Sequence, residues 1–197
     1  MTRIRVMLAV VLIAALVAGC SVSKEKQPRA LAPNELPPEL QTPTTVVATS
    51  LPTGKPQLPI YVFDPQAKRL HPLVVAVDSK TPDAVLQALV SNEQVKDPYT
   101  TDIPAGLTLG DTSTTKMGGC RTLRIPVSDV LSTLQGDQQR IAVAQLVYTA
   151  TEFPDIDCVT FRIKGQSVDI PTGAKGGTAM VVSRKDYSDI APKGTTS

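Results

Sequence analysis

The 197-residue chain contains no tryptophan, one histidine at position 71, three Phe and four Tyr. Sites that bind nucleobases or sugars normally stack them on several aromatic rings, so this composition speaks against both kinds of site. A single histidine also leaves little material for acid–base catalysis of the Ser-His-Asp or Cys-His kind. The core must therefore be built from aliphatic residues, mainly Val, Leu, Ile and Ala.

The chain also lacks a large excess of positive or negative charge. The chain has 20 Lys and Arg against 18 Asp and Glu, and Arg3 and Arg5 account for the whole difference. A nucleic-acid-binding domain normally carries a basic excess, so we expect no nucleic-acid partner. The balanced remainder also offers no general attraction to an acidic membrane surface.

The apolar run over residues 6–17 is shorter than the roughly 18–20 residues that span a bilayer. It follows two arginines and ends in two small residues directly before Cys20, which is the order of a bacterial export signal. The segment resembles the lipobox of bacterial lipoproteins, which are cut before the cysteine and acylated on its thiol. We expect residues 1–19 to be a lipoprotein signal peptide and Cys20 to carry lipid, such as palmitate. The alternatives are secretion without lipid and a membrane-spanning anchor.

Under this interpretation the chain is anchored at the extracytoplasmic face of the cell membrane, and the membrane is a partner through the lipid. Residues 20–57 then comprise the lipidated cysteine and a flexible linker, because they are rich in Pro, Ser, Thr, Lys and Gln. Such a composition cannot bury enough apolar surface to fold. At ~3.1 Å per residue for a proline-rich path, the linker would reach on the order of 100 Å. The run 44–48 is the one stretch that would suit an added strand.

Residues 58–187 carry the pattern of a folded domain, and 188–197 look like a frayed tail. Thr81, Pro82 and Asp83 form a helix start, with an apolar face that runs to Val90. A second, longer helix is predicted over 137–153 and ends at Pro154, and a short helical turn over 129–134. Apolar runs and alternation predict strands at 60–63, 70–77, 107–109, 120–127, 158–164, 167–170 and 178–182. The small, polar stretch 111–119 is predicted to be a loop, and 183–197 an edge segment that frays.

Cys120 and Cys158 remain once Cys20 is assigned to lipid. An even pair in an oxidising compartment predicts a disulfide. Both cysteines open strands that flank the long helix, and a helical crossover makes such strands parallel. The two thiols then lie at the same end of the sheet, within reach if the strands are neighbours. A reactive thiol or a metal site is the alternative, although His71 is the only histidine that would join it.

A family resemblance rests on three pieces: AQLVYTAT at 144–151, Phe153-Pro154, and VTFRIKG at 159–165. Together they resemble the core signature of the GerMN domain of sporulation and spore germination proteins. The turn at 103–107 resembles the family's IP-x-G-T, and 184–187 resembles the closing segment of actinobacterial lipoproteins similar to LpqB. Pro126 stands where the family's strand commonly has Asp, so any role of that Asp is in doubt.

The resemblance implies a single small α/β domain (α+β mixed), with a mixed β-sheet and two main helices, like the ring-building modules of bacterial envelope assemblies. It also implies association with envelope proteins and no enzymatic activity. Self-association into a homo-oligomer stays open.

No residue is predicted to be catalytic, to bind a cofactor or to hold a metal. His71 is interpreted as an exposed turn residue, and Asp155 and Asp157 as a solvated turn rather than a calcium site. Four basic residues are candidates for one sheet face that binds an anionic polymer or partner, or that is merely solvated: Arg121, Arg124, Arg162 and Lys164.

The sequence therefore predicts a non-catalytic, membrane-anchored envelope lipoprotein that acts by binding proteins, as an accessory to envelope assembly or signalling. Strand addition at exposed edges near 58–63 and 178–182 would be one way to bind them. The alternative is a binder of a small ligand or a cell-wall polymer. A hydrolase ranks last, because the acid–base inventory is thin.

Overall fold

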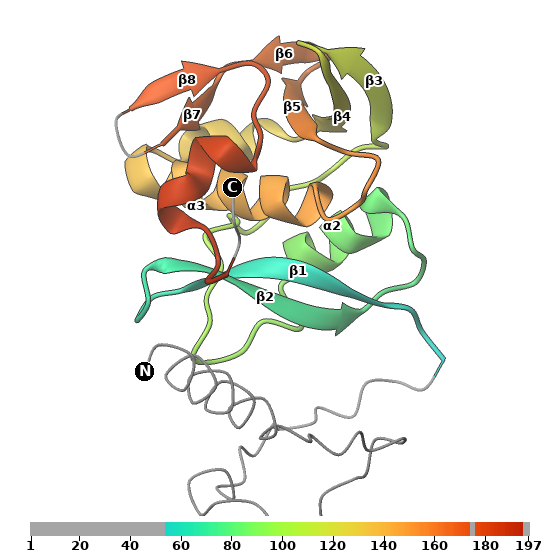
Figure 1. The fold of residues 1–197 in the computed structure, drawn as a ribbon, viewed down its shortest axis with the longest axis vertical. Helices are drawn as coiled ribbons and strands as arrows, with labels where there is room; N and C mark the ends of the chain where they lie inside the picture. Colours follow the sequence, from blue (N-terminus) through green and yellow to red (C-terminus); the bar gives the residue numbers. More distant parts are fainter. Residues whose placement is uncertain (1–53, 174–175, 195–197) are drawn as a thin grey trace, which may run out of the picture. The chain divides into compact units, whose positions relative to one another are not determined.

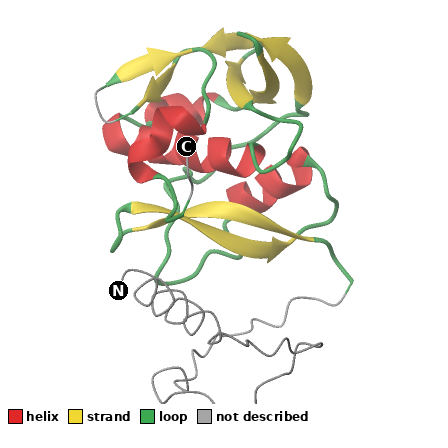
Figure 2. Cartoon of the chain, in the orientation of Figure 1, coloured by secondary structure: helices red, strands yellow, loops and turns green. Residues whose placement is uncertain are grey.

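Two helices lie between a β-hairpin and a four-stranded sheet in the computed structural model, which describes residues 54–173 and 176–194 (Figure 1). The predicted signal peptide, Cys20 and all of the linker before Gly54 lie outside the described residues. The hairpin consists of β1 (Gln57–Asp64) and β2 (Arg69–Ala76), and the helices are α2 (Pro82–Ser91) and α3 (Gly136–Ala150). The mixed α/β fold class is confirmed, and Figure 2 shows how its helices and strands are distributed.

The strands after α2 form two further sheets. The four-stranded sheet has the order β3-β4-β5-β6, and β7 pairs with β8 in a separate hairpin. These strands are β3 (Ser113–Met117), β4 (Cys120–Pro126), β5 (Cys158–Ile163), β6 (Gln166–Val168), β7 (Ile170–Thr172) and β8 (Gly177–Ala179). Two 3-10 segments complete the domain: η3 (Asp129–Thr133) and η4 (Arg184–Ile190).

Helix α2 begins as its sequence predicts. The Thr81 side chain accepts a hydrogen bond from the backbone N–H of Ala84, and Pro82 occupies the first turn, where its missing N–H leaves no gap. Asn92 ends the helix in the left-handed conformation, at φ 58°. Val85, Leu86 and Leu89 form the buried face that the periodicity indicated.

Helix α3 is buried on every side over its last ten residues, Ile141–Ala150. It contacts β1 on one side and β5, β7 and η4 on others, so an ordinary amphipathic stripe would not suit it. Gln145 and Thr149 are polar and fully buried within this apolar stretch. Their hydrogen bonds, described below, explain how α3 tolerates them.

The helix also serves as the crossover between β4 and β5, which pair in parallel with Thr122 opposite Cys158. Cys120 and Cys158 are disulfide-bonded, with their Cα atoms 6.2 Å apart. The predicted disulfide and the parallel neighbours on which it depends are therefore present.

Three local predictions are wrong. Residues 113–117 form strand β3 rather than a loop, because an edge strand needs only a backbone partner and its side chains can stay polar. Residues 184–190 do not fray: η4 buries Tyr187 and Ile190, and Ser183 and Asp186 close its start with a capping box. The predicted strand at 107–109 is reduced to a single bridge between Leu109 and Val127.

Candidate functional site

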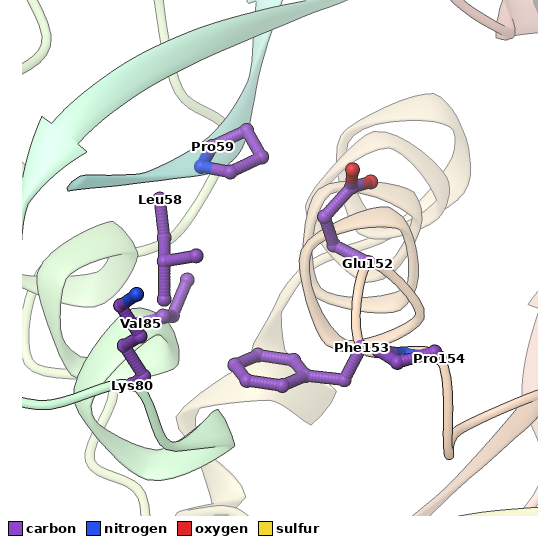
Figure 3. Close-up of a pocket in the computed structure, with 7 residues that line it drawn as sticks. All are labelled: Leu58, Pro59, Lys80, Val85, Glu152, Phe153 and Pro154. Atoms are coloured by element: carbon purple, nitrogen blue, oxygen red, sulfur yellow. The ribbon is translucent and has the colours of Figure 1, made fainter. Parts of the chain in front are cut away.

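An open, mostly apolar pocket of about 260 Å³ lies where the start of β1, the start of α2 and the end of α3 meet. Seven residues line it, and Figure 3 shows them: Leu58, Pro59, Lys80, Val85, Glu152, Phe153 and Pro154. The Phe153 ring points toward Leu58 and Val85, while Lys80 and Glu152 stand on opposite sides. The pocket thus has an apolar floor and one charge of each sign at its rim.

The local sequence places these side chains. Helix α3 ends at Ala150, and the backbone N–H of Phe153 still bonds to the carbonyl of Ala150, which turns the chain out of the helix. Pro154 cannot continue a helix, so Phe153 is left at the helix end, facing the pocket. Leu58 and Pro59 come from the second and third residues of β1.

Glu152 belongs to a partly buried polar network behind the pocket. Its Oε2 accepts hydrogen bonds from the Tyr61 hydroxyl at 2.8 Å and from Arg184 Nη2 at 2.6 Å. Arg184 also donates to the Thr151 hydroxyl at 2.8 Å and to the Tyr148 carbonyl at 3.0 Å. The network fixes the carboxylate at the rim and joins η4 to α3 and β1.

The same guanidinium lies over two aromatic rings, 5.4 Å from the centroid of Tyr61 and 5.0 Å from that of Tyr148. Burial, reinforced by the hydrogen bond to Glu152, raises the pKa of Tyr61 to about 12. Burial also raises the pKa of the Tyr148 hydroxyl. Both phenols are therefore neutral at physiological pH and serve as hydrogen-bond donors and packing surfaces rather than as acids.

The outer edge of β1 is closed along much of its length. The Tyr61 N–H donates to the Thr149 hydroxyl at 3.0 Å, and the Tyr61 carbonyl accepts from Gln145 Nε2 at 3.1 Å. Phe63 exchanges both backbone hydrogen bonds with Thr100, and Pro59 has no N–H to offer. The prediction that 58–63 is an exposed edge for strand addition is therefore wrong. Side chains of α3 take the place of a neighbouring strand.

The other polar residues considered from the sequence, His71, Asp155 and Asp157, each contact a neighbouring side chain. His71 lies within β2, and its ring stacks on Tyr99 with centroids 4.3 Å apart. Asp155 and Asp157 both bind Arg121, at 2.8 and 3.0 Å. Among the described residues no cluster of three or more His, Cys, Asp or Glu is placed to hold a metal ion.

The four candidate basic residues do not share one face. Arg121 lies on the same side of β4 as the buried Leu123, and the two aspartates bind its guanidinium group. Lys164 pairs with Asp129 at 2.9 Å. Arg124 and Arg162 alone remain together on the outer face of the sheet, as the register of β4 and β5 requires.

In the described part of the chain, no helix has both the length and the hydrophobicity to cross a bilayer.

A family model described as Germane, sporulation and spore germination, matches residues 59–169. The chain belongs to the Germane family. This match covers more than half of the sequence and includes every residue of the pocket except Leu58. No curated protein sequence matches the chain.

Two solved structures agree with the Germane assignment. The first GerMN domain of the sporulation protein GerM from Bacillus subtilis is 21% identical, with a TM-score of 0.52, over 66% of this chain and 99% of that one. The tandem GerMN domains of the same protein are 22% identical, with a TM-score of 0.51, over 67% of this chain. The match spans 47% of the tandem protein, so this chain corresponds to about half of its length. At these identities the likeness establishes the fold.

The sequence did not single out the pocket or its polar network. Neither Glu152 nor Arg184 has a sequence signal of its own, because charged residues 32 positions apart give no sign of their contact. Two signals were present: the Phe153-Pro154 pair that ends a strongly apolar helix, and the order Ser-x-x-Asp at 183–186, which is the pattern of a capped helical turn.

Proposed function

We propose that this Germane-family chain is a non-catalytic, membrane-anchored envelope lipoprotein whose domain binds another envelope protein through the pocket around Phe153. In this proposal Cys20 carries the lipid, residues 20–57 form the tether, and the domain acts as an accessory in envelope assembly or signalling. Self-association through the same surface is one form that such binding would take.

The size and lining of the pocket carry the proposal. Ligand sites usually enclose roughly 300–1,000 Å³, and the pocket of about 260 Å³ falls below that range while remaining open to solvent. A cavity of this size suits one or two apolar side chains of a partner. Protein interfaces characteristically bury such anchors in pockets surrounded by a polar rim, which Lys80 and Glu152 supply here.

A non-catalytic role is supported by what the polar groups already do. His71 is stacked on Tyr99, and Glu152 is engaged by Tyr61 and Arg184. Burial raises the pKa of the Tyr61 and Tyr148 hydroxyls further above the physiological range, so neither is poised to lose its proton. A nucleophile with an adjacent base is the arrangement that covalent catalysis requires, and the described residues around the pocket do not contain one.

Binding of a small ligand is the second candidate, and one observation favours it. A larger cavity of about 560 Å³ lies beside α2, and polar side chains dominate its lining, including Asp78, Thr81, Asp83, Gln87 and Gln94. Its volume lies within the ligand range, whereas such sites are usually mostly apolar. For this reason we rank it second.

Crosslinking in intact cells tests the protein-binding proposal. We expect the wild-type chain and a Met180→Ser control to crosslink to the same envelope protein, since Met180 is an exposed apolar residue away from the pocket lining. Phe153→Ser and, separately, the rim substitution Lys80→Glu should lose that neighbour. Recovery of wall fragments without any protein neighbour would instead favour the polymer-binding alternative.

Mass spectrometry of the mature chain tests the anchor. We expect cleavage before Cys20 and a diacylglycerol mass on its thiol, and a Cys20→Ala variant should leave the membrane fraction. An uncut, unmodified N-terminus would contradict the lipoprotein assignment and leave the pocket proposal standing on its own.

A further inference from the structure

The face of the four-stranded sheet that points away from the helices is polar, and it is distinct from the pocket. Along β4 and β5 the side chains alternate between the two faces. Leu123, Ile125, Val159 and Phe161 point to the helices and are fully buried. The opposite face therefore carries the fully buried Thr122 and Thr160 and the half-buried Arg124 and Arg162.

Arg124 and Arg162 stand next to each other on this face. Arg124 lies opposite Thr160, and Arg162 lies two residues further along β5, opposite Pro126. With strands about 4.8 Å apart and a rise of about 3.3 Å per residue, their Cα atoms are separated by roughly 8 Å. Two cationic side chains on neighbouring positions of one sheet face repel each other, and a shared anion would relieve the repulsion.

Neither arginine has a carboxylate partner among the described residues. Arg121, Arg140 and Arg184 all form ion pairs with acids, whereas Arg124 has no hydrogen-bond or ion-pair partner there. Within the described part of the chain, the side chain of Arg162 donates only to the carbonyl of Gly165, so no acid there compensates its charge. Both side chains are half-buried, so they are held against the sheet rather than dispersed in solvent.

Residues with hydroxyl groups neighbour the two arginines in the sheet. Ser113 of β3 lies opposite Arg124, Ser167 of β6 lies opposite Arg162, and both serines are exposed. Thr160 lies beside Arg124 and two residues before Arg162, and its hydroxyl is buried with no hydrogen-bond partner in the described chain. A buried hydroxyl without a partner is unfavourable, and because Thr160 is fully buried an oxyanion reaches it only when the side chains that cover it move aside.

We propose that Arg124 and Arg162, with Ser113, Thr160 and Ser167, form a binding site for the phosphodiester groups of an extracellular polyol-phosphate polymer. Guanidinium groups bind phosphate oxygens in pairs through their planar fork, and serine hydroxyls add neutral donors. One phosphodiester group of the extended polymer would lie between the two arginines.

Other anionic partners fit this face less well. A protein interface usually has a large apolar or aromatic anchor at its centre, and the neighbours here are threonines, serines and Pro126. A single-stranded nucleic acid would normally stack its bases on aromatic rings, and none lies on this face of β4 and β5. Binding to acidic lipids normally takes four to eight clustered cations, and this face presents two.

The test uses the full chain in detergent micelles and titrates it with poly(glycerol phosphate), with neutral dextran of equal length as the blank. We expect measurable binding that weakens as salt rises from about 0.05 to 0.15 M, because exposed charges are screened. The double variant Arg124→Gln/Arg162→Gln should bind at least tenfold more weakly. The control Arg69→Gln/Lys96→Gln removes two charges elsewhere and should change affinity less than twofold.

Two further titrations distinguish the polymer from other molecules that carry phosphate groups. If vesicles of phosphatidylglycerol or single-stranded DNA of equal phosphate content bind more tightly than the polymer, the proposal is overturned. It is also overturned if the polymer does not bind or if both double variants weaken binding equally. Should the Gln variant unfold, Arg124→Lys/Arg162→Lys keeps the charges but removes the forks, and at least a threefold loss is expected from it. Neither result depends on the Phe153 pocket.

Discussion

Arg184 shows how one side chain can organise the space between three elements. Its guanidinium satisfies a helix carbonyl, a hydroxyl and a carboxylate, and it also covers two tyrosine rings. It is 30% exposed, so water screens part of the ion pair with Glu152. Most of its contribution to stability therefore comes from geometry and packing rather than from charge.

Replacing Arg184 by alanine should lower the free energy of unfolding by about 2 kcal/mol, the combined scale of a charged hydrogen bond and a partly screened cation–π contact. Arg184→Lys should recover less than half of this loss, because an ammonium group cannot reproduce the fork. The neighbouring exposed residue provides the control, and Lys185→Ala should stay within about 0.5 kcal/mol of wild type. Urea unfolding followed by circular dichroism measures all three, and equal losses for Arg184→Ala and Lys185→Ala would disprove the role of Arg184.

Because of Tyr61, the stability of the domain should vary with pH in the alkaline range. The unfolded chain releases the phenol proton near pH 10, whereas the folded chain holds it until about pH 12 because burial and Glu152 disfavour the phenolate. Between these values the unfolded state binds fewer protons, so stability should fall as pH rises, by at most about 1.4 kcal/mol per pH unit. Burial raises the pKa of Tyr148 and Tyr187 as well, and they act in the same direction.

Urea midpoints at pH 9, 10 and 11 test this dependence. The wild-type midpoint should decline with pH, and Tyr61→Phe should decline less steeply even though it starts from a lower value at pH 9, since it lacks the bond to Glu152. Identical slopes for the two proteins would show that Tyr61 is not the titrating group.

At the scale of elements, the edge of β1 is closed by a helix. Gln145 accepts from the backbone N–H of Asp102 at 3.0 Å while it donates to Tyr61, so one amide joins α3, β1 and the connection after α2. Thr149 completes the edge one helical turn later. An unpaired strand edge invites pairing with other chains, and here the fold removes that hazard without using another strand.

Thr149→Val keeps the shape of the side chain but leaves the buried N–H of Tyr61 without an acceptor. We expect a loss of about 1–3 kcal/mol in the free energy of unfolding, the usual consequence of an unsatisfied buried donor. Thr114→Val at an exposed position of the edge strand β3 is the matched control and should be neutral or slightly stabilising. Faster amide exchange at Tyr61 in the Thr149 variant, measured by NMR, would assign the loss to this bond. Unchanged exchange would refute the assignment.

Elements with a burial pattern could be predicted from the sequence, and elements held by backbone contacts could not. Helix α2 was predicted because Thr81, Pro82 and the spacing of Val85 and Leu89 all indicate the same element. Strand β3 was missed because Ser-Thr-Thr-Lys shows no apolar alternation, and its position depends on pairing with β4. The segment η4 was missed because Tyr187 and Ile190 are two apolar residues in a polar tail, and only the space beside α3 makes them core.

At the scale of the whole molecule, the same distinction separates the disulfide from the pocket. The bond between Cys120 and Cys158 could be predicted because a single crossover helix already decides that both cysteines lie at one end of two parallel strands. The pocket draws on residues 58–59, 80–85 and 152–154, which meet only when the hairpin packs on both helices. No local sequence pattern encodes that meeting. The pair Arg124 and Arg162 likewise became apparent only from the strand register, which separates them from Arg121, and from the ion pair that Lys164 makes with Asp129.

The disulfide is expected to stabilise the whole domain rather than the sheet alone. It closes a segment of 38 residues that contains η3 and all of α3, so its loss frees the unfolded chain over the part that forms the core. The chain-entropy model gives about 3–4 kcal/mol for a loop of this length. Cys120→Ala/Cys158→Ala should lower the free energy of unfolding by that amount, and dithiothreitol should destabilise the wild type but leave the double variant unchanged. A thiol count on the exported wild-type chain should find neither cysteine free. Two free thiols at these positions, or a double variant as stable as wild type, would show that the covalent bond is not what holds β4 and β5 together.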